Sequence, residues 1–429
     1  MGAAALGRAI GEGADPVEVA EAFLAAIADH PDGARVYART TPERARAEAA
    51  AARDRARAGT RRGPLDGVPV SWKDLFDTAG VRTEGGTALL AGRVPQRDAA
   101  VVARGARAGL VALGKTHLTE LAFSGLGLNP VTATPPNRFD PAWLPGGSSS
   151  GAAASVALGL AGAAVGSDTG GSARLPAAWN GIVGFKPAHG ALPLEGALAL
   201  CPSFDTVGPM GRGVEDVGLL WEALGGPRAD LRGASLAGAR LGVLRLEGDE
   251  APMAAFERAL DALGRAGARV EEVALPVAEA AEAGAPLFPA EAWASWRDAV
   301  GERADLIFAP VRARLLAGRD VGAADYLAAR ARLGAARGAA RAALAAFDAV
   351  LWPACPMLPP PVAEVADDPE AFRRLNLRAL SLTRVANLLG LASLCLPLPV
   401  PGTGLLLNAG PGREGLLLRL GLAAERAMA

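Results

Sequence analysis

Residues 145–176 constrain this chain more than any other stretch, because two glycine- and serine-rich clusters flank a run of small apolar residues. The clusters cover residues 146–151 and 166–172, and residues 152–165 between them are almost wholly apolar. Glycines allow positive φ angles and close backbone approach, so several N–H groups can point at one position. Serine hydroxyls can act there as nucleophiles or donors. The pattern predicts either two flexible turns around a buried helix or a catalytic site built from both clusters.

Length and charge restrict the function classes. The chain has 429 residues, a formal net charge of -1 and 21% charged residues, with neither a basic patch nor an acidic tail. This balance disfavours a nucleic-acid partner. The N-terminus lacks the basic start and apolar segment of a signal peptide, and the longest apolar run, residues 151–166, is shorter than the roughly 20 residues of a membrane span. We therefore expect a cytoplasmic protein that acts on a small molecule, with no membrane partner.

Lysine is rare in this chain, and that rarity selects candidate bases. Of the 44 basic residues only Lys73, Lys115 and Lys186 are lysines. Arginine stays protonated at working pH, whereas a buried lysine can lose its proton. Lys73 directly follows residues 68–72, where alternating apolar side chains predict a short strand. Each lysine is therefore a candidate for proton transfer.

The three cysteines indicate no chemistry of their own. Cys201, Cys355 and Cys395 lie far apart, lack CxxC spacing and sit in apolar contexts, which is typical of core packing in a reducing compartment. No His, Cys and carboxylate residues have the spacing of metal ligands. We expect neither a metal nor an organic cofactor.

One alternative function is a P-loop nucleotidase. The segment that begins at Gly109 and ends at Thr116, GLVALGKT, formally matches the phosphate-binding motif GxxxxGK[ST]. That motif needs a loop whose backbone wraps phosphates, but residues 110–113 form an apolar run typical of a strand. The run disfavours this alternative and predicts that Lys115 leads into a helix instead.

A second alternative is an α/β-hydrolase that uses Ser149. Residues 147–151, GSSSG, match the nucleophile-elbow motif GxSxG with Ser149 at its centre. That fold needs a histidine downstream, and the one candidate, His189, follows after only 40 residues. Because little sheet can form in that length, a Ser-His-Asp hydrolase is disfavoured.

Three motifs, in order, resemble those of the amidase signature family. They are GVPVSWKD, which contains Lys73, PGGSSSG, which contains Ser148, and GSDTGGSARLP, which contains Ser172. The separations of 75 and 24 residues between these three residues are also similar to that family's. Further likeness at residues 180–187, 203–210 and 387–392 extends the resemblance over nearly the whole chain, and residues 224–348 are least recognisable.

The resemblance implies a Ser-Ser-Lys catalytic triad. Ser172 would be the nucleophile, Lys73 the base that begins neutral, and Ser148, after a cis peptide bond with Gly147, the relay between them. It also implies an oxyanion hole built from the backbone N–H groups of Thr169, Gly170, Gly171 and Ser172. We expect three further residues to support this loop and the relay: Asp168, Arg174 and Ser149.

Strands that alternate with helices predict a layered α/β fold. We expect one domain over residues 1–429, with a large, mixed, mostly parallel sheet covered by helices on both faces. Its parts would be N-terminal helices (1–60), a catalytic core (61–215), a variable, mostly helical part with added strands (216–380), and C-terminal core strands with a helix (381–429). Predicted helices cover residues 15–30, 41–58, 98–108, 252–267 and 323–347, and predicted strands cover 68–72, 110–113, 241–246, 268–275, 350–353, 391–400 and 405–407.

The activity that the resemblance implies is hydrolysis of a carboxylic acid amide to an acid plus ammonia or an amine, without a cofactor. Within the family, the competing role is the A subunit of glutamyl-tRNA amidotransferase, which would release ammonia from glutamine for partner subunits. The chain is short for that role, so we favour a stand-alone amidase. A catalytically silent binding homologue is disfavoured because all three triad residues are present. The sequence is compatible with many amide substrates and with a homodimer.

Overall fold

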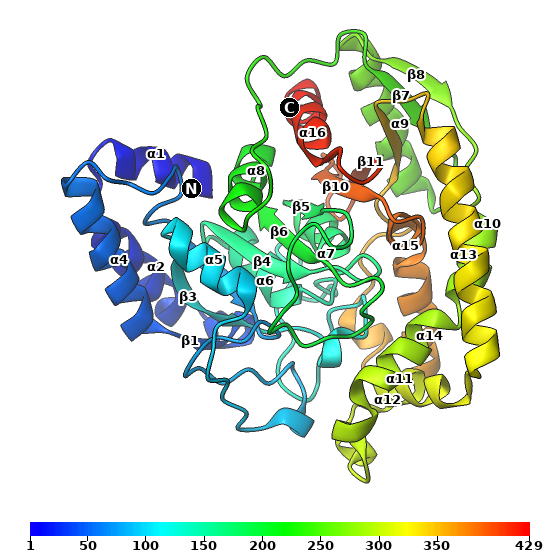
Figure 1. Cartoon of the computed structure of the whole chain (residues 1–429), viewed down its shortest axis with the longest axis horizontal. Helices are drawn as coiled ribbons and strands as arrows, with labels where there is room; N and C mark the ends of the chain where they lie inside the picture. The colour runs from blue at the N-terminus through cyan, green and yellow to red at the C-terminus, as the bar shows by residue number, and fades with distance from the viewer.

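One sheet of eleven strands organises the molecule, and the computed structural model describes all 429 residues of the chain. The strand order is β1-β3-β2-β4-β6-β5-β10-β11-β9-β7-β8 (Figure 1). The strands are β1 (Tyr37–Thr40), β2 (Pro69–Lys73), β3 (Val111–Thr116), β4 (Ala163–Ser167), β5 (Val183–Lys186), β6 (Val207–Gly211), β7 (Arg240–Val243), β8 (Arg269–Glu272), β9 (Ala349–Pro353), β10 (Ala392–Pro397) and β11 (Gly404–Ala409).

The sheet is mixed, as predicted, but the prediction that it is mostly parallel is wrong. Four neighbouring pairs are parallel, namely β2 with β3, β2 with β4, β7 with β8 and β7 with β9. The other six pairs are antiparallel. Antiparallel neighbours need no helical crossover. β10 and β11, for example, are joined only by residues 398–403.

The helices pack on both faces of the sheet, as predicted. In a strand, consecutive side chains point to opposite faces. A Cβ atom at Gly404 would contact Ala178 of α7 and Cys395 of β10, whereas a Cβ atom at Gly421 of α16 would meet the neighbouring Leu394. Because Leu394 and Cys395 are adjacent in β10, α7 and α16 lie on opposite faces of this strand.

Helix signals in the sequence locate several of the helices correctly. The Asp15 side chain accepts a hydrogen bond from the Val17 backbone N–H at 2.8 Å and begins α2, and the predictions for α4, α9 and α13 are also confirmed. Figure 1 shows α1, α2 and α4 on one flank and α13 on the other. The α-helices are α1 (Ala3–Gly11), α2 (Pro16–Asp29), α3 (Gly33–Val36), α4 (Pro42–Arg57), α5 (Ala100–Ala108), α6 (Ser150–Ala157), α7 (Arg174–Asn180), α8 (Val214–Ala223), α9 (Glu250–Arg265), α10 (Val277–Gly284), α11 (Leu287–Val300), α12 (Ala309–Leu316), α13 (Ala323–Leu344), α14 (Pro369–Ala379), α15 (Ser381–Leu388) and α16 (Glu414–Met428).

The helix predicted after Lys115 is wrong. Only one short 3-10 turn, η2 (Glu120–Ala122), follows β3. The backbone of this segment bonds to other loops instead: the N–H of Thr119 donates to Ser148 O at 3.2 Å, and that of Leu121 donates to Gly85 O at 3.0 Å. The segment therefore lies against the first serine cluster. The other 3-10 turns are η1 (Ala88–Leu90), η3 (Ala304–Leu306), η4 (Ala317–Asp320) and η5 (Val362–Glu364).

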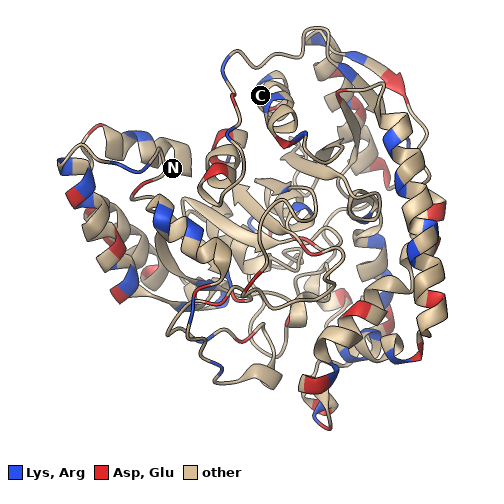
Figure 2. Cartoon of the chain, viewed as in Figure 1, with Lys and Arg blue, Asp and Glu red and all other residues tan.

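The surface carries both signs of charge. Figure 2 shows Arg residues interspersed with Asp and Glu residues along α4, whereas α13 carries four arginines and one acidic residue, Asp325. The helices include none with both the length and the apolar character to cross a membrane. All three cysteines are free and buried, which confirms that they pack in the core.

Candidate active site

Lys73 ends β2, in the interior of the sheet between β3 and β4, and its side chain is fully buried. Its Nζ donates to Ser148 Oγ at 2.7 Å and to Ser167 Oγ at 2.8 Å. Burial lowers the pKa of Lys73 to about 7, against the opposing effect of the Asp168 and Asp205 charges. A substantial fraction of this amine is therefore neutral at pH 7 and can accept a proton.

Ser148 lies in the turn that precedes α6 and is fully buried. The peptide bond between Gly147 and Ser148 is cis, in agreement with the resemblance. A Cβ atom at Gly147 would lie 2.9 Å from Gly127 N and 3.0 Å from Ser124 O, so the turn has no room for a side chain there. Close packing of these loops thus orients the Ser148 hydroxyl toward Lys73.

Ser172 lies between β4 and α7 and is 5% exposed. The backbone N–H of Ser149 donates to Ser172 O at 3.0 Å, which holds the two serine clusters side by side. Lys73 and Ser148 form the first hydrogen bond of the predicted relay. The structure contains no hydrogen bond between the hydroxyls of Ser148 and Ser172.

A fully buried ion pair supports the loop that carries Ser172. Arg174 Nε donates to Asp168 Oδ2 and Arg174 Nη2 to Asp168 Oδ1, each at 2.9 Å. The carboxylate also accepts from the backbone N–H groups of Gly171 at 2.8 Å and Ala173 at 3.1 Å. Although burial opposes ionisation, the Arg174 guanidinium holds the pKa of Asp168 well below its usual range. The ionised pair therefore fixes the turn from both ends.

The same pair connects the loop to the C-terminal part of the chain. Arg174 also donates to Thr383 O at 2.9 Å, Ser393 Oγ at 3.1 Å and Asn387 Oδ1 at 2.5 Å. Asn387 in turn donates from Nδ2 to Asp168 Oδ1 at 2.9 Å. Asn387 lies in a segment that carried the resemblance, but its contact with Asp168 was not predicted.

Three of the four predicted oxyanion-hole donors are free. The backbone N–H groups of Thr169, Gly170 and Ser172 make no hydrogen bond within the chain. The N–H of Gly171 is different, because it donates to the Asp168 carboxylate at 2.8 Å. Free N–H groups at the same turn as the proposed nucleophile are what an oxyanion hole requires.

The Ser149 hydroxyl supports the loops, and it has no histidine as a hydrogen-bond partner. Its Oγ donates to Ser167 O at 3.1 Å and accepts from the Ser167 backbone N–H at 3.2 Å. The one downstream histidine, His189, is exposed, with its Nε2 2.8 Å from Pro202 O. The Ser-His-Asp alternative is therefore wrong.

The other two lysines make structural contacts. Lys115 is buried within β3, and its Nζ donates to Phe76 O and Thr83 Oγ1, each at 2.7 Å. The same Nζ lies 3.1 Å from Asp74 Oδ1. Because residues of the apparent phosphate motif form a strand, the P-loop alternative is wrong. Lys186 is buried and donates to Pro187 O at 3.0 Å. Lys73 is thus the lysine whose amine contacts serine hydroxyls.

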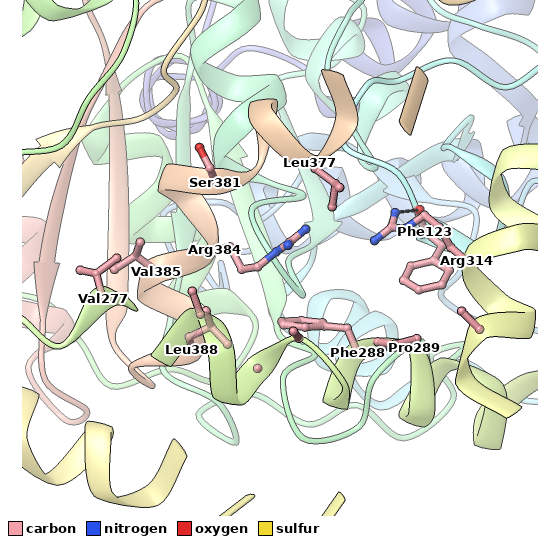
Figure 3. A pocket seen from close by; sticks show the side chains of 14 residues that line it. Phe123, Val277, Phe288, Pro289, Arg314, Leu377, Ser381, Arg384, Val385 and Leu388 are labelled. Atoms are coloured by element: carbon pink, nitrogen blue, oxygen red, sulfur yellow. Dashed lines mark hydrogen bonds between the residues drawn. The ribbon is translucent and has the colours of Figure 1, made fainter. Parts of the chain in front are cut away.

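Two cavities lie near the loop of residues 167–172: residues of the loop line one of them, and the Arg384 side chain, which lines the other, lies beside Gly170. The Ser167 cavity, of about 500 Å³, is lined by Ser167, Thr169 and Asp205 with mainly apolar residues of the 189–202 segment. The arginine cavity, of about 370 Å³, is lined by the side chains of α10, α11, α12, α14 and α15 in Figure 3, together with Phe123. Its two charged lining residues are Arg314 and Arg384.

Sequence reasoning missed several of these residues. Ser167 stands inside a motif that carried the resemblance, directly before Asp168, and only the fold shows that it contacts Lys73. The arginines of the arginine cavity had no local signal, since 41 of the 44 basic residues are arginines. No group of three His, Cys, Asp or Glu side chains has the arrangement of a metal site.

The sequence matches the family described as Amidase over residues 18–418. The chain belongs to the amidase family. Membership makes it a hydrolase of carbon–nitrogen bonds. The solved structures that it resembles include one described as amidase, at 35% identity and a TM-score of 0.88 over 100% of both chains. They also include a peptide amidase from Stenotrophomonas maltophilia, at 29% identity and a TM-score of 0.84 over 98% of this chain and 95% of that chain.

The chain also resembles proteins named as the A subunit of an amidotransferase. The chain is 40% identical to the A subunit of glutamyl-tRNA(Gln) amidotransferase from Symbiobacterium thermophilum over 282 residues, which span 61% of this chain and only 58% of that protein. It is 34% identical to the corresponding protein of Chloroflexus aggregans over 96% of this chain and 92% of that protein. The solved A subunit of the Thermotoga maritima amidotransferase matches at 30% identity and a TM-score of 0.72, over 85% of this chain and 84% of that chain.

Proposed function

We propose that the protein is a stand-alone amidase that hydrolyses a small carboxamide through an acyl-enzyme on Ser172. The observation that carries the proposal is the buried Lys73 amine, whose Nζ lies 2.7 Å from Ser148 Oγ and whose pKa is lowered to about 7 by burial. A neutral buried lysine beside a serine relay is a suitable base for a serine nucleophile that has no histidine.

In the first half of the reaction, Ser172 Oγ attacks the carbonyl carbon of the amide. Its proton passes through Ser148 to the neutral Lys73, and the carbonyl oxygen takes the negative charge. When the C–N bond breaks, the proton returns from Lys73 through Ser148 to the departing nitrogen, which leaves as ammonia or an amine. Ser172 is then esterified by the acyl group.

In the second half, water attacks the ester carbon. A water proton moves through Ser148 to Lys73, and the acid leaves as Ser172 recovers a proton by the same relay. Both tetrahedral intermediates carry an oxyanion, which the free N–H groups of Thr169, Gly170 and Ser172 would stabilise. Removal of one such donor typically costs about 100- to 1000-fold in rate.

The second candidate is an A subunit that hydrolyses glutamine for an amidotransferase, which the names of the sequence relatives favour. Fold comparison supports the stand-alone role. The structure described as amidase matches over 100% of both chains at a TM-score of 0.88, against 0.72 over 85% of this chain for the solved A subunit of the amidotransferase. We therefore place the stand-alone amidase first.

The test is ammonia release from primary carboxamides, glutamine included, by the purified chain and by Ser172→Ala. Ser235→Ala is the matched control, because Ser235 lies in an exposed loop. We expect turnover that Ser172→Ala reduces at least 1000-fold, as removal of a catalytic nucleophile does, and that Ser235→Ala leaves unchanged. Hydroxylamine should trap the acyl group. Without hydroxylamine, mass spectrometry should find the acyl group on the peptide that contains Ser172.

Two results would redirect the proposal. Turnover that persists in Ser172→Ala would remove Ser172 from the mechanism. Ammonia release from glutamine alone, and only with partner subunits added, would assign the chain to the amidotransferase.

A further inference from the structure

The arginine cavity contains two guanidinium groups without an acidic partner. Arg314 of α12 donates to Phe123 O, and Arg384 of α15 has a buried Nε that makes no hydrogen bond. No aspartate or glutamate lines the cavity. Burial, and then the neighbouring charge of Arg384, lower the pKa of Arg314 to about 9, while burial lowers the pKa of Arg384. Arginine stays protonated at neutral pH, so both groups carry a charge that no carboxylate compensates.

Aromatic rings stabilise these cations only in part. The guanidinium carbon of Arg314 lies 4.1 Å from the Phe123 ring centre, and that of Arg384 lies 5.4 Å from the Phe288 ring centre. Cation–π contacts hold a cation in place without neutralising it. In Figure 3 the two guanidinium groups extend into the same space from different helices, above Phe288. Two convergent, unpaired guanidiniums are well suited to a carboxylate, which accepts paired N–H donors.

Arg384, which lines the arginine cavity, lies beside Gly170 of the proposed oxyanion hole. Thr383 Oγ1, next to Arg384 in α15, donates to Gly170 O at 3.0 Å. A Cβ atom at Gly170 would lie 3.6 Å from Arg384 Nε. A substrate whose carbonyl oxygen meets the N–H of Gly170 can therefore reach Arg384 with a short chain.

The proposed mechanism orients the acyl part of the substrate toward this cavity. In the proposed mechanism, the leaving nitrogen receives its proton from Lys73 through Ser148, so it must face that side. Ser167, which accepts a hydrogen bond from Lys73, lines the other cavity. The acyl chain then extends away from Lys73, toward Arg384, between apolar walls that include Val277 and Leu388.

We propose that the acyl part of the substrate ends in a carboxylate bound by Arg314 and Arg384, so that the substrate is the monoamide of a dicarboxylic acid. This inference rests on the proposed amidase function. Because no acidic residue lines the cavity, it offers no partner to an ammonium group, and the structure therefore favours a dicarboxylic monoamide over glutamine.

The test compares amides of equal length that differ in the terminal group. Succinamate is paired with butanamide, glutaramate with pentanamide and adipamate with hexanamide. In each neutral partner a methyl group replaces the carboxylate. We expect kcat/KM for at least one anionic amide to exceed that of its neutral partner 10-fold or more. Glutamine should be a poorer substrate than glutaramate.

Substitution of Arg384 tests the cause of this preference. Arg384→Met should lower the ratio of anionic to neutral kcat/KM about 10- to 100-fold, the range of a lost charge-assisted hydrogen bond, and Arg384→Lys should restore part of it. Arg332→Met is the matched control, since Arg332 is exposed on α13, and it should leave the ratio unchanged. If Arg384→Met does not fold, Leu377→Glu places a competing carboxylate at the rim of the cavity, where Leu377 is exposed, and should lower the same ratio, whereas Leu377→Gln should not.

Binding to an inactive protein separates this inference from the proposed function. Glutaramate should bind Ser172→Ala at least 10-fold more tightly than it binds the Ser172→Ala/Arg384→Met double variant, as titration calorimetry can measure, whether or not the chain turns amides over. Equal binding, equal kcat/KM for charged and neutral amides, or a preference for glutamine would overturn the inference. So would a preference for acetylglycine, whose carboxylate lies on the amine side.

Discussion

The replacement of Lys73 by methionine should make the stability of the protein less dependent on pH. A lysine that is free in water has a pKa of 10.5, whereas burial lowers that of Lys73 to about 7. The unfolded chain therefore binds a proton at this residue over a pH range in which the folded chain does not. Stability rises with pH wherever the unfolded state binds more protons.

The sign and size follow from these two values. Above pH 10.5 the amine is neutral in both states and costs nothing, and the cost of burying it grows as the pH falls until it is complete below about 7. One pKa unit corresponds to about 1.4 kcal/mol. Between pH 9 and pH 7 the cost therefore grows by about 2 kcal/mol. The hydroxyls of Ser148 and Ser167, which lose a donor in the variant, add a penalty that does not vary with pH in this range.

The assay is urea unfolding of the wild type and of Lys73→Met at pH 7 and pH 9. The seven tryptophans allow fluorescence to follow the transition, and circular dichroism tests whether both probes coincide. Subtracting the two proteins cancels the titration of Lys115, Lys186 and other groups whose pKa does not depend on Lys73. We expect the free energy of unfolding of the variant, relative to wild type, to fall by about 2 kcal/mol from pH 7 to pH 9. A difference that is equal at both pH values would refute a lowered pKa for Lys73.

Three further predictions concern the site. The kcat/KM for pentanamide should rise about 10-fold per pH unit below pH 7 and level off above it, because only neutral Lys73 accepts the proton. A profile that is flat from pH 5 to 7 would contradict the assignment of Lys73 as the base. Asp168→Asn leaves the buried Arg174 charge uncompensated and should lower the free energy of unfolding by about 3–5 kcal/mol, so an unchanged urea midpoint would argue against the ion pair. Gly171→Ala puts a Cβ atom 2.0 Å from Thr383 Oγ1 at a φ of +128°. It should lower both Tm and amide turnover, and a thermal melt equal to wild type would show that the loop can move aside.

Local sequence signals predicted the central strands β2 and β3, but not β4, which leads into the loop that carries Ser172, nor the sheet around them. Residues 68–72 alternate and residues 110–113 are continuously apolar, and both became buried parallel strands, β2 and β3. β6 was missed because it reads VGPMG, and glycine and proline are depleted in strands. β6 forms nonetheless, since it pairs with β4 on one side and β5 on the other. Such pairings join residues far apart in sequence, so neither they nor the antiparallel directions could be derived from periodicity.

Motifs identified the proposed catalytic residues because their chemistry is concentrated in short segments. Ser148, Ser149, Asp168 and Ser172 fall within two loops that the apolar run of residues 152–165 joins. Contacts between distant segments were beyond such reasoning. The hydrogen bond from Asn387 to Asp168, for example, crosses 219 residues of sequence and depends on the approach of α15 to the loop.

In this chain 41 of the 44 basic residues are arginines. The presence of an arginine at a position therefore says little about its role, whereas the groups that it contacts say much. Arg174 faces Asp168 at 2.9 Å, so its charge is used within the fold. Arg314 and Arg384 come from different helices, meet at one cavity, and have no carboxylate there. Both side chains are half-buried, and the buried Nε of Arg384 has no hydrogen-bond partner, which is costly for a buried donor. A fold that keeps two such charges beside the proposed oxyanion hole is better suited to an anionic ligand than to a neutral one, and this argument depends on positions that only the three-dimensional structure defines.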